Sequence, residues 1–378
     1  MSTIRDTDLI RTNDYAEDSG EVRVLDPDGR LLPGATEPDL SDEALVTMYE
    51  AMKTARRFDE RAVSWQRQGR LATYAPMSGQ EAGQVASTLA LADEDWVFPT
   101  YREHAVRLVA GFDLPDILRG LMGAELPAGT AGGPTVTPEA IPIATQLPHA
   151  TGAAMAARHR GDESIALTHF GDGATSEGDF HEALNFAGVF DAPAVYLCHN
   201  NQWAISVPRA RQTASATLAQ KADAYGFEGI RVDGMDPLAV YSVVRYAREK
   251  ALDPDAEDLR PTLIESVEYR YGAHTTADDP DVYRDDEEVD YWRDRDPIDR
   301  LETFLVETGR LDEAEVEAID SRVDERVAAA IAEAESRPAP DSDGLFEHVH
   351  EDLPPRAVEQ REQLRRLRDR HGDALLRD

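Results

Sequence analysis

The sequence predicts an α/β protein in which a parallel sheet carries helices on both faces and a helical extension follows at the C-terminus. Short apolar runs typical of strands alternate with stretches of helical periodicity, and connections of that length join parallel strands through right-handed crossovers. From about residue 282 onward the strand signals stop, and only helical segments follow. The 378 residues suffice for two or three domains, or for one large α/β domain with appendages.

The first strong helix covers residues 41–67. Ser41 is a good N-cap, acidic residues follow it in the first turn, and apolar residues recur every three or four positions from Leu45 to Trp65. The expected strands lie at 95–99, 163–170, 194–199, 229–233 and 262–270, and the later helices at 146–160, 177–190, 215–226, 236–252, 297–309, 312–336 and from about 356.

The N-terminal residues 1–40 are polar and interrupted by Pro and Gly, and we expect them to form a loosely held arm. Within them, the alternating run from Glu21 to Leu25 could be a single strand. The sequence therefore divides into this N-terminal arm, a sheet domain at 41–280 and a helical extension at 281–378.

The net charge is the most unusual property of the composition. With 39 Lys and Arg against 74 Asp and Glu, the formal charge is −35, and only three of the basic residues are lysines. This balance excludes a general nucleic-acid binder, which needs a basic surface to neutralise phosphates. The acids are spread along the chain, so the charge indicates a halophilic surface whose self-repulsion is screened by salt, rather than an acidic tail.

The single cysteine, Cys198, cannot form an internal disulfide, and the first thirty residues show no apolar core of a secretory signal. No stretch of about 18 apolar residues indicates a membrane span. We therefore expect a cytoplasmic protein, in which Cys198 is a small buried hydrophobic residue.

The chemistry is expected where two strands end, because ligands of open parallel sheets bind beyond the carboxyl ends of the strands. The run 163–170 leads into Gly171-Asp172-Gly173-Ala174 and then a helix, and the run 194–199 leads into Asn200-Asn201-Gln202-Trp203. The glycines allow close approach of a phosphate to a helix N-terminus. Asp172, the Asn201 side chain and a carbonyl near Trp203 offer the oxygen ligands that Mg²⁺ prefers.

A Gly-Asp-Gly tripeptide by itself is more often an ordinary turn. Here 26 residues separate it from Asn200-Asn201, with one helix and one buried strand between them. This arrangement resembles the thiamine diphosphate motif of thiamine-dependent enzymes. The longer stretches around it, together with FPTYREHAVRLVAGF upstream, resemble the alpha subunit of the decarboxylating component of 2-oxo acid dehydrogenase complexes, closest to the pyruvate and branched-chain types, from about residue 45 to 350.

The resemblance implies a thiamine diphosphate-binding fold and a role for each matching residue. Tyr101 and Arg102 would hold the diphosphate of the cofactor, for which the planar guanidinium is suited. Ile143 would support the bent cofactor, and His274 would be the active-site histidine that contacts the cofactor and the reaction intermediate. Mg²⁺ would be bound by Asp172, Asn201 and the Trp203 carbonyl, the backbone of Gly171, Gly173 and Ala174 would line the diphosphate, and Thr100, Tyr101 and Ile143 would lie beside the substrate.

Several residues near these motifs have simpler interpretations. A lone histidine such as His274 is usually a surface loop residue, and His181 could equally support the site or face the core. Glu177 and Asp179 sit where the helix dipole favours acids, and we interpret both as structural.

Thr275 stands where mammalian relatives carry a regulatory phosphoserine. Pro142, Thr145 and Gln146 match a potassium-binding turn of some relatives, but Ala140 and Ile141 replace its serines, so we do not expect that cation.

The resemblance implies an oxidoreductase that decarboxylates pyruvate or a branched-chain 2-oxo acid, as in branched-chain amino acid catabolism, and reductively acylates a lipoyl group on an acyltransferase partner. The glutamate that activates thiamine comes from a pyrimidine-binding domain in this family, and this chain has only one predicted sheet. We therefore expect a beta subunit and a heterotetramer of two alpha and two beta chains. The alternatives are an acetoin dehydrogenase and a noncatalytic diphosphate-binding paralogue. Residues 124–140 lack the basic segment that the mammalian types carry there, and this difference weakens the assignment of the substrate.

Overall fold

The computed structural model describes residues 11–12, 20–124, 126–338, 342–347 and 349–372. The chain forms two compact units, Met1–Ile331 and Ala332–Asp378. The first unit contains the sheet, and the described part of the second contains α11 (Gly344–Glu347) and α12 (Pro355–His371), which has no buried residue. Helix α10 (Glu313–Ser336) includes the boundary between the units. The division at residues 40 and 280 that the sequence suggests stays a prediction.

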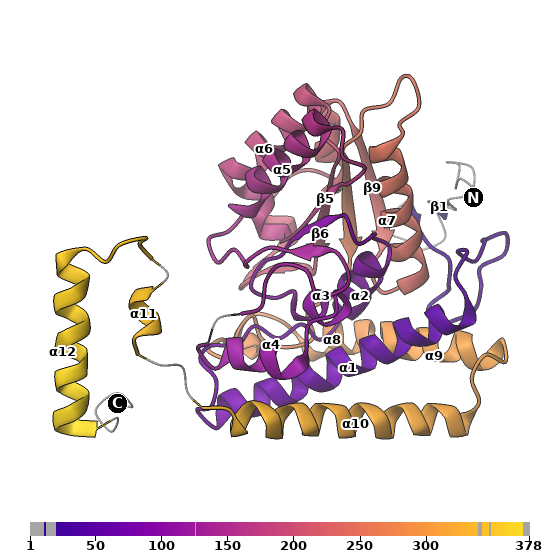
Figure 1. The fold of residues 1–378 in the computed structure, drawn as a ribbon. Coiled ribbons are helices and arrows are strands. Elements are labelled where there is room, and N and C mark those ends of the chain that lie inside the picture. Colours follow the sequence, from indigo (N-terminus) through magenta and orange to yellow (C-terminus); the bar gives the residue numbers. More distant parts are fainter. Residues whose placement is uncertain (1–10, 13–19, 125, 339–341, 348, 373–378) are drawn as a thin grey trace. The chain divides into compact units, whose positions relative to one another are not determined.

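An eight-stranded sheet forms the centre of the first unit (Figure 1). All neighbouring strands are parallel except β1 and β2, so the α/β class predicted from the sequence is confirmed. In spatial order the strands are β1 (Arg11–Thr12), β2 (Glu21–Val22), β9 (Glu228–Asp233), β10 (Thr262–Val267), β6 (Ala194–Asn200), β5 (Ala166–Gly171), β3 (Trp96–Phe98) and β4 (Thr135–Val136), and a separate two-stranded ribbon pairs β7 (Trp203–Ala204) with β8 (Val207–Pro208).

Helices cover both faces of this sheet. Figure 1 shows α5 and α6 on one side and α7 on the other, where α2 packs against α7. The helices of the first unit before α10 are α1 (Asp42–Arg67), α2 (Glu81–Leu89), α3 (His104–Val109), α4 (Leu114–Leu121), α5 (Gln146–Arg160), α6 (Gly178–Phe190), α7 (Pro237–Leu252), α8 (Asp286–Arg293) and α9 (Pro297–Glu307). The helix predicted at 215–226 is wrong, because the chain there forms only a 3₁₀ segment at Ala219–Tyr225. The sequence also missed the helices α2, α3, α4 and α8 of this unit.

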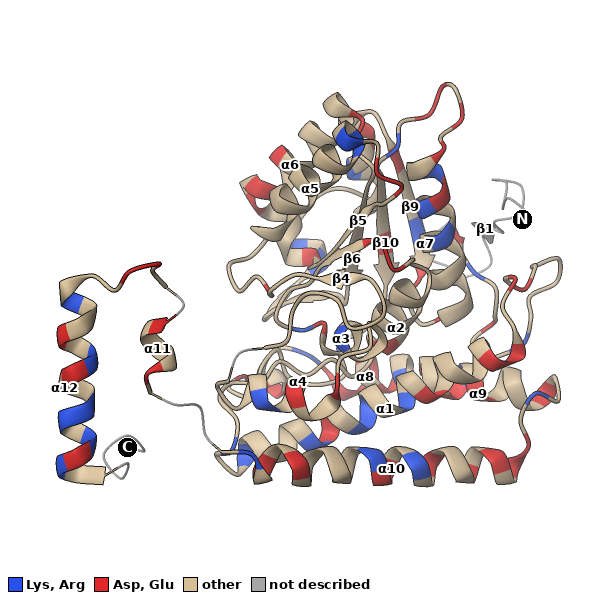
Figure 2. Cartoon of the chain, viewed as in Figure 1, with Lys and Arg blue, Asp and Glu red and all other residues tan. Residues whose placement is uncertain are grey.

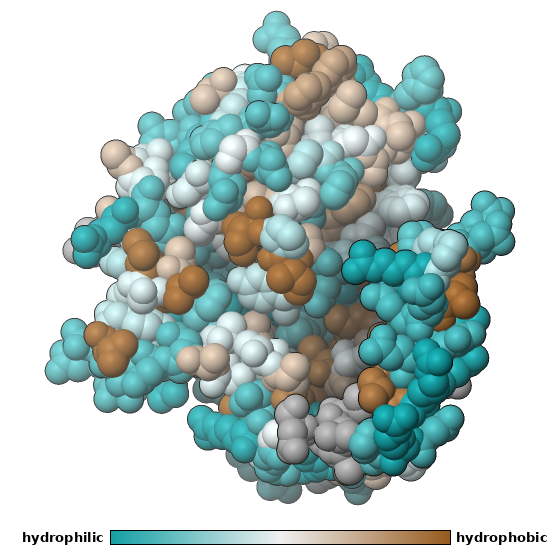
Figure 3. Space-filling model, turned by 90° about the vertical axis from the view of Figure 1, so that its left-hand side faces the viewer, coloured by the Kyte–Doolittle hydropathy of each residue, from teal (hydrophilic) through white to brown (hydrophobic). Residues whose placement is uncertain are grey.

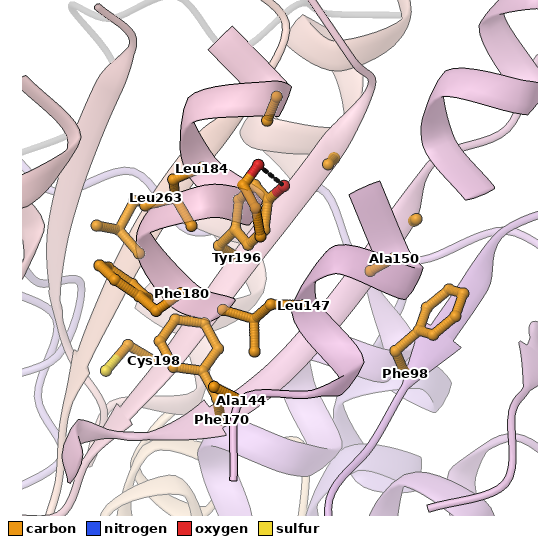
Figure 4. Close-up of a cluster of buried hydrophobic side chains, with 14 of the residues drawn as sticks. Phe98, Ala144, Leu147, Ala150, Phe170, Phe180, Leu184, Tyr196, Cys198 and Leu263 are labelled. Carbon is orange, nitrogen blue, oxygen red and sulfur yellow. Dashed lines mark hydrogen bonds between the residues drawn. The ribbon is translucent and has the colours of Figure 1, made fainter. Parts of the chain in front are cut away.

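A hydrophobic cluster between the sheet and the α5–α6 layer supports the ends of β5 and β6 (Figure 4). Phe170 and Cys198, near the carboxyl ends of these strands, are fully buried in it with Phe180 of α6 and Leu147 of α5. The expectation that Cys198 is a buried small hydrophobic residue is therefore confirmed. Burial of large side chains on this scale contributes about 1.5–3 kcal/mol each to folding, so the loops that follow both strands start from fixed points.

The chain from Glu21 to Asp26 is held tightly against the sheet and α9. Glu21–Val22 pairs in parallel with β9, and Leu25 is fully buried, so the expectation of a loosely held arm is wrong for residues 21–25. The Asp236 carboxylate accepts hydrogen bonds at 2.7 Å from the backbone N–H groups of Val24 and Leu25. Buried Arg300 of α9 donates to Asp233 at 3.0 Å and to the Asp26 carbonyl at 2.7 Å.

No helix among the described residues is long and apolar enough to cross a membrane.

We predict that Asp236→Ala lowers the free energy of unfolding by about 3 kcal/mol or more. Besides its two bonds to the N-terminal segment, the other carboxylate oxygen caps α7 by accepting from Leu238 and Ala239 at 3.1 Å. Urea unfolding of the full chain at constant salt would measure the change. Ser41→Ala is the control, because the Ser41 hydroxyl caps α1 with one exposed bond to Ala44, and its loss should cost about 1 kcal/mol. Equal effects of the two substitutions would contradict the prediction.

Candidate functional site

A pocket of about 250 Å³ opens beyond the carboxyl ends of β3, β5 and β6. It brings together every site residue that the sequence singled out, although these residues come from five separate stretches of the chain. The predicted residues that line it are Thr100, Tyr101, Arg102, Ile143, Gly171, Asp172, Gly173, Ala174, Asn201, Trp203 and His274. The pocket lining shows proximity, and the individual roles of these residues remain predictions.

The pairing of β5 with β6 positions the two loops predicted to bind a cation. Gly171 lies opposite His199 in register, so Asp172 and Asn201 follow at adjacent strand ends. Asp172 begins a 3₁₀ turn that continues to Ser176, and α6 begins at Gly178. The strand-turn-helix connection predicted for the Gly-Asp-Gly motif is therefore present, with a 3₁₀ turn before the helix.

The Asp172 carboxylate is buried, which raises its pKa, and the charge of Arg270 acts in the opposite direction without pairing with it directly. Among the described residues no Lys, Arg or His forms an ion pair with it, and burial raises the pKa of Asp172 to about 6. Its one side-chain partner is the neutral amide of Gln212, whose Nε2 donates to Oδ2 at 2.6 Å. A buried carboxylate in this state is stabilised by a cation, so the site fits the predicted metal.

Asn201 and Trp203 supply the other predicted oxygen ligands. The Trp203 backbone N–H donates to Asn201 Oδ1 at 3.3 Å, and the Trp203 carbonyl accepts a hydrogen bond from Arg270 at 3.4 Å. Both oxygens retain capacity for a further partner. No group of three or more His, Cys, Asp and Glu side chains that could hold a metal occurs within the described ranges. A cation here would depend on one carboxylate, an amide, a carbonyl and the oxygens of its ligand, which is the pattern of Mg²⁺ sites.

Arg102 lies in the pocket wall, 5% exposed, and much of its guanidinium is already engaged. It donates to the Pro76 carbonyl, to the His274 carbonyl at 2.9 Å and to His274 Nδ1 at 3.1 Å. A guanidinium has five N–H donors, so a diphosphate contact by Arg102, as the resemblance implies, would use the remaining two.

His274 is held in one tautomer by two arginines. Its Nδ1 lies 3.1 Å from Arg102 and 3.2 Å from Arg270, both of which can only donate. Nδ1 must therefore be the acceptor, and the proton of the neutral ring must be on Nε2. Burial, together with Arg102 and Arg270, lowers the pKa of His274 to about 4. The structure places His274 in the pocket rather than on an open surface loop.

The site residues predicted from the sequence do not include three polar residues in or next to the pocket that contact predicted ligands or their neighbours. His199, the residue before the last of β6, lines the pocket, with Nδ1 2.8 Å from Glu268 and Nε2 2.9 Å from His169. Although burial opposes its charged form, the Glu268 carboxylate raises the pKa of His199. Its position directly before Asn200-Asn201 could have indicated it. Gln80 and Gln212, which contact Asn201 and Asp172, carry no local sequence signal.

Two further interpretations change. Glu177, read as only structural, is the N-cap residue of α6 and also lines the pocket. His181 is exposed on α6 and contacts the Tyr225 hydroxyl, so it neither supports the pocket nor faces the core. Asp179 lies in the first turn of α6, as expected from the helix dipole.

Comparison with known proteins gives a consistent result over most of the chain. Residues 49–343 match the family model described as the dehydrogenase E1 component. The 3-methyl-2-oxobutanoate dehydrogenase subunit alpha of Mycobacterium tuberculosis is 46% identical over 356 residues, which cover 91% of this chain and 93% of that protein. The pyruvate dehydrogenase E1 component subunit alpha of Staphylococcus aureus is 41% identical over 355 residues, which cover 93% and 94%.

We predict that His274 stays neutral, with its proton on Nε2, above about pH 5, and that it becomes charged only as the pH falls toward about 4. The two arginines oppose a positive charge and occupy Nδ1. Nuclear magnetic resonance of the chain with ¹⁵N-labelled histidine would report the protonation of both ring nitrogens, and His274→Gln would assign the signals. A protonated Nδ1, or a titration midpoint near the ordinary value of 6.5, would contradict this tautomer.

Proposed function

Because the chain belongs to the dehydrogenase E1 component family, we propose that it is the alpha subunit of a 2-oxo acid dehydrogenase, an oxidoreductase. The observation that carries this proposal is that one pocket collects every residue assigned to the site from the sequence. Relatives named for 3-methyl-2-oxobutanoate and for pyruvate are similarly close, at 46% and 41% identity. The substrate class is therefore a pyruvate-type or branched-chain 2-oxo acid, decarboxylated before its acyl group passes to the lipoyl group of an acyltransferase.

We propose that the pocket binds thiamine diphosphate and Mg²⁺. Thiamine diphosphate, when bound, supplies the carbon that reacts with the 2-oxo acid and the ring that accepts the electrons left by decarboxylation. Asp172, Asn201 and the Trp203 carbonyl are suited to hold the cation. Glycine at position 173 lets the Gly-Asp-Gly turn lie close to β7, because a Cβ at this position would lie 2.8 Å from Ala204 Cβ. A side chain there would displace the β7 loop that carries the Trp203 carbonyl.

The residues of this chain would then act by position and charge. Arg102 and Tyr101 would hold the diphosphate, with the backbone of Gly171, Gly173 and Ala174 beside it. Ile143 would support the cofactor, and Thr100 would lie on the substrate side. His274 would present Nε2–H, a neutral donor, toward a developing negative charge on the substrate oxygen, because its Nδ1 is occupied by the arginines.

We propose that a beta subunit completes the site in a heterotetramer of two alpha and two beta chains. Within the described residues the only other sheet is the β7–β8 ribbon, so this part of the chain offers no second domain for the pyrimidine end of the cofactor. Ile143 and Ile205 line the pocket yet are about half exposed, at 47% and 54%. Figure 3 shows separate apolar groups on a largely hydrophilic face. Half-exposed apolar side chains in a pocket lining, such as Ile143 and Ile205, suit cover by a partner chain.

We propose that the acidic surface is an adaptation to high salt and that the protein works in the cytoplasm, which its single cysteine supports. Acidic side chains occur along α8, α9 and α10 as well as in loops, rather than in one tail (Figure 2). Their mutual repulsion falls as salt shortens the Debye length. We also propose the three-part division into an arm at 1–40, a cofactor domain at 41–280 and a helical extension at 281–378.

We predict that Asp172→Ala weakens the binding of thiamine diphosphate with Mg²⁺ at least about a hundredfold, and that Gln212→Ala weakens it about tenfold. The first removes the one carboxylate ligand, and the second removes only the 2.6 Å bond that orients it. Isothermal titration calorimetry measures both. Asp162→Ala is the control, because Asp162 pairs with Arg160 on the surface and does not line the pocket. Unchanged affinity in Asp172→Ala would show that the cation is bound elsewhere.

We predict that the purified chain alone decarboxylates no 2-oxo acid and that addition of the beta subunit restores turnover. The physical reason is that the activating glutamate must come from a second polypeptide. The assay uses a dye acceptor, a panel of pyruvate and branched-chain 2-oxo acids, and several salt concentrations. Substantial turnover by the chain alone would refute the requirement, and equal turnover in dilute and in molar salt would refute the salt adaptation.

A further inference from the structure

Gln80 is a buried amide in the wall of the pocket that the sequence motifs do not include. It is 1% exposed, lines the pocket and precedes α2 as its N-cap residue. Its backbone N–H donates to the Met77 carbonyl at 2.9 Å, and its carbonyl accepts from Gln84 at 3.3 Å. The main chain here is also confined on the other side, because a Cβ at Gly79 would lie 2.0 Å from the Tyr269 carbonyl. The position of the Gln80 side chain is therefore fixed by its surroundings.

The orientation of the Gln80 amide follows from that of Asn201. The Trp203 N–H donates to Asn201 Oδ1, which identifies this atom as the oxygen and turns Nδ2 toward Gln80. Asn201 Nδ2 then donates to Gln80 Oε1 at 3.2 Å. Because the Gln80 oxygen faces Asn201, the Gln80 Nε2 must point away from Asn201. Among the described residues this buried Nε2 has no hydrogen-bond partner.

An unpaired buried amide donor is unfavourable unless a partner arrives, because burial removes the water that would otherwise bind it. Here the donor belongs to a residue of the pocket wall, and its other end holds a predicted cation ligand. We therefore expect the missing partner to be an acceptor atom of the ligand that the pocket binds, at the point where this ligand meets the cation.

We propose that Gln80 is a binding residue for the diphosphate, and this inference rests on the proposed function. Its Nε2 donates to an anionic diphosphate oxygen, while its Oε1 keeps Asn201 Oδ1 directed toward the cation. A neutral amide suits both tasks, since it donates to the anion and accepts from Asn201 without adding charge beside Asp172. The carboxylate of a 2-oxo acid is less suited as the acceptor, because Gln80 is tied to the cation side through Asn201.

The experiment measures binding of inorganic diphosphate in the presence of Mg²⁺ to the full-length chain by isothermal titration calorimetry. Gln80→Met, which removes both the donor and the acceptor, should weaken binding at least about tenfold. Gln80→Glu keeps an acceptor for Asn201 but replaces the donor by a negative charge, and it should weaken binding about a hundredfold. Thr88→Val is the control, because the Thr88 hydroxyl is buried on α2 with one bond to the Gln84 carbonyl at 2.8 Å and does not line the pocket. It should bind as the wild type does, and circular dichroism would verify that each variant is folded.

The outcomes separate this inference from the proposed function. If diphosphate binds equally to the wild type and to both Gln80 variants, while Asp172→Ala abolishes binding, the role of Gln80 is wrong and the proposed site stands. An equal loss in Thr88→Val would also overturn the role of Gln80, since the effect would then be general. If the wild-type chain binds no diphosphate with Mg²⁺ either alone or together with its beta subunit, the proposed function itself fails. If only Gln80→Met is unfolded, Gln80→Glu decides.

Discussion

The parallel pairing of β5 with β6 is the constraint on which the rest of the pocket depends. The strands are buried almost throughout and in register up to Gly171 and His199, so the two loops that carry oxygen donors must leave the sheet side by side. The cluster of Phe170, Phe180 and Cys198 fixes both strand ends against α6. A shift of one residue in this register would turn the side chains of one strand to the opposite face, which would bury polar groups and separate Asp172 from Asn201.

The second constraint is that a site for an anion needs local positive charge, although the chain has a formal charge of −35. A few buried groups in and around the pocket, rather than a basic surface, supply this positive charge. Arg102 and Arg270 converge on His274 Nδ1, and each also donates to two backbone carbonyls, which holds both cations in place. Since these charges are shielded from solvent, added salt weakens them far less than it weakens repulsion between surface carboxylates. Such a pocket can attract an anion under conditions that screen the exterior.

The sequence predicted the features that depend on neighbouring residues. The strands that flank the pocket, the turn at Gly171–Ala174 and the residues Tyr101, Arg102, Asn201 and His274 were all identifiable from local pattern and resemblance. Gln80 and Gln212 were not, because each acts on a residue far along the chain, Asn201 and Asp172, through a fold that no periodicity encodes. The helix predicted at 215–226 is wrong for a different reason. The spacing of its apolar residues fits an α-helix, but a 3₁₀ segment at 219–225 that packs on β9 satisfies the same spacing.

The two glutamines explain how one carboxylate can serve as the charged part of a cation site. Each donates to, or accepts from, a predicted cation ligand and sets its direction without changing the charge of the site. With Asp172 as the single anion, the protein alone neutralises only half of the charge of a divalent cation. The remaining negative charge must come from the ligand, so the cation and the diphosphate would stabilise each other and bind together. A second carboxylate in place of either amide would favour the metal alone and repel the diphosphate, which is why neutral partners suit a site that holds both.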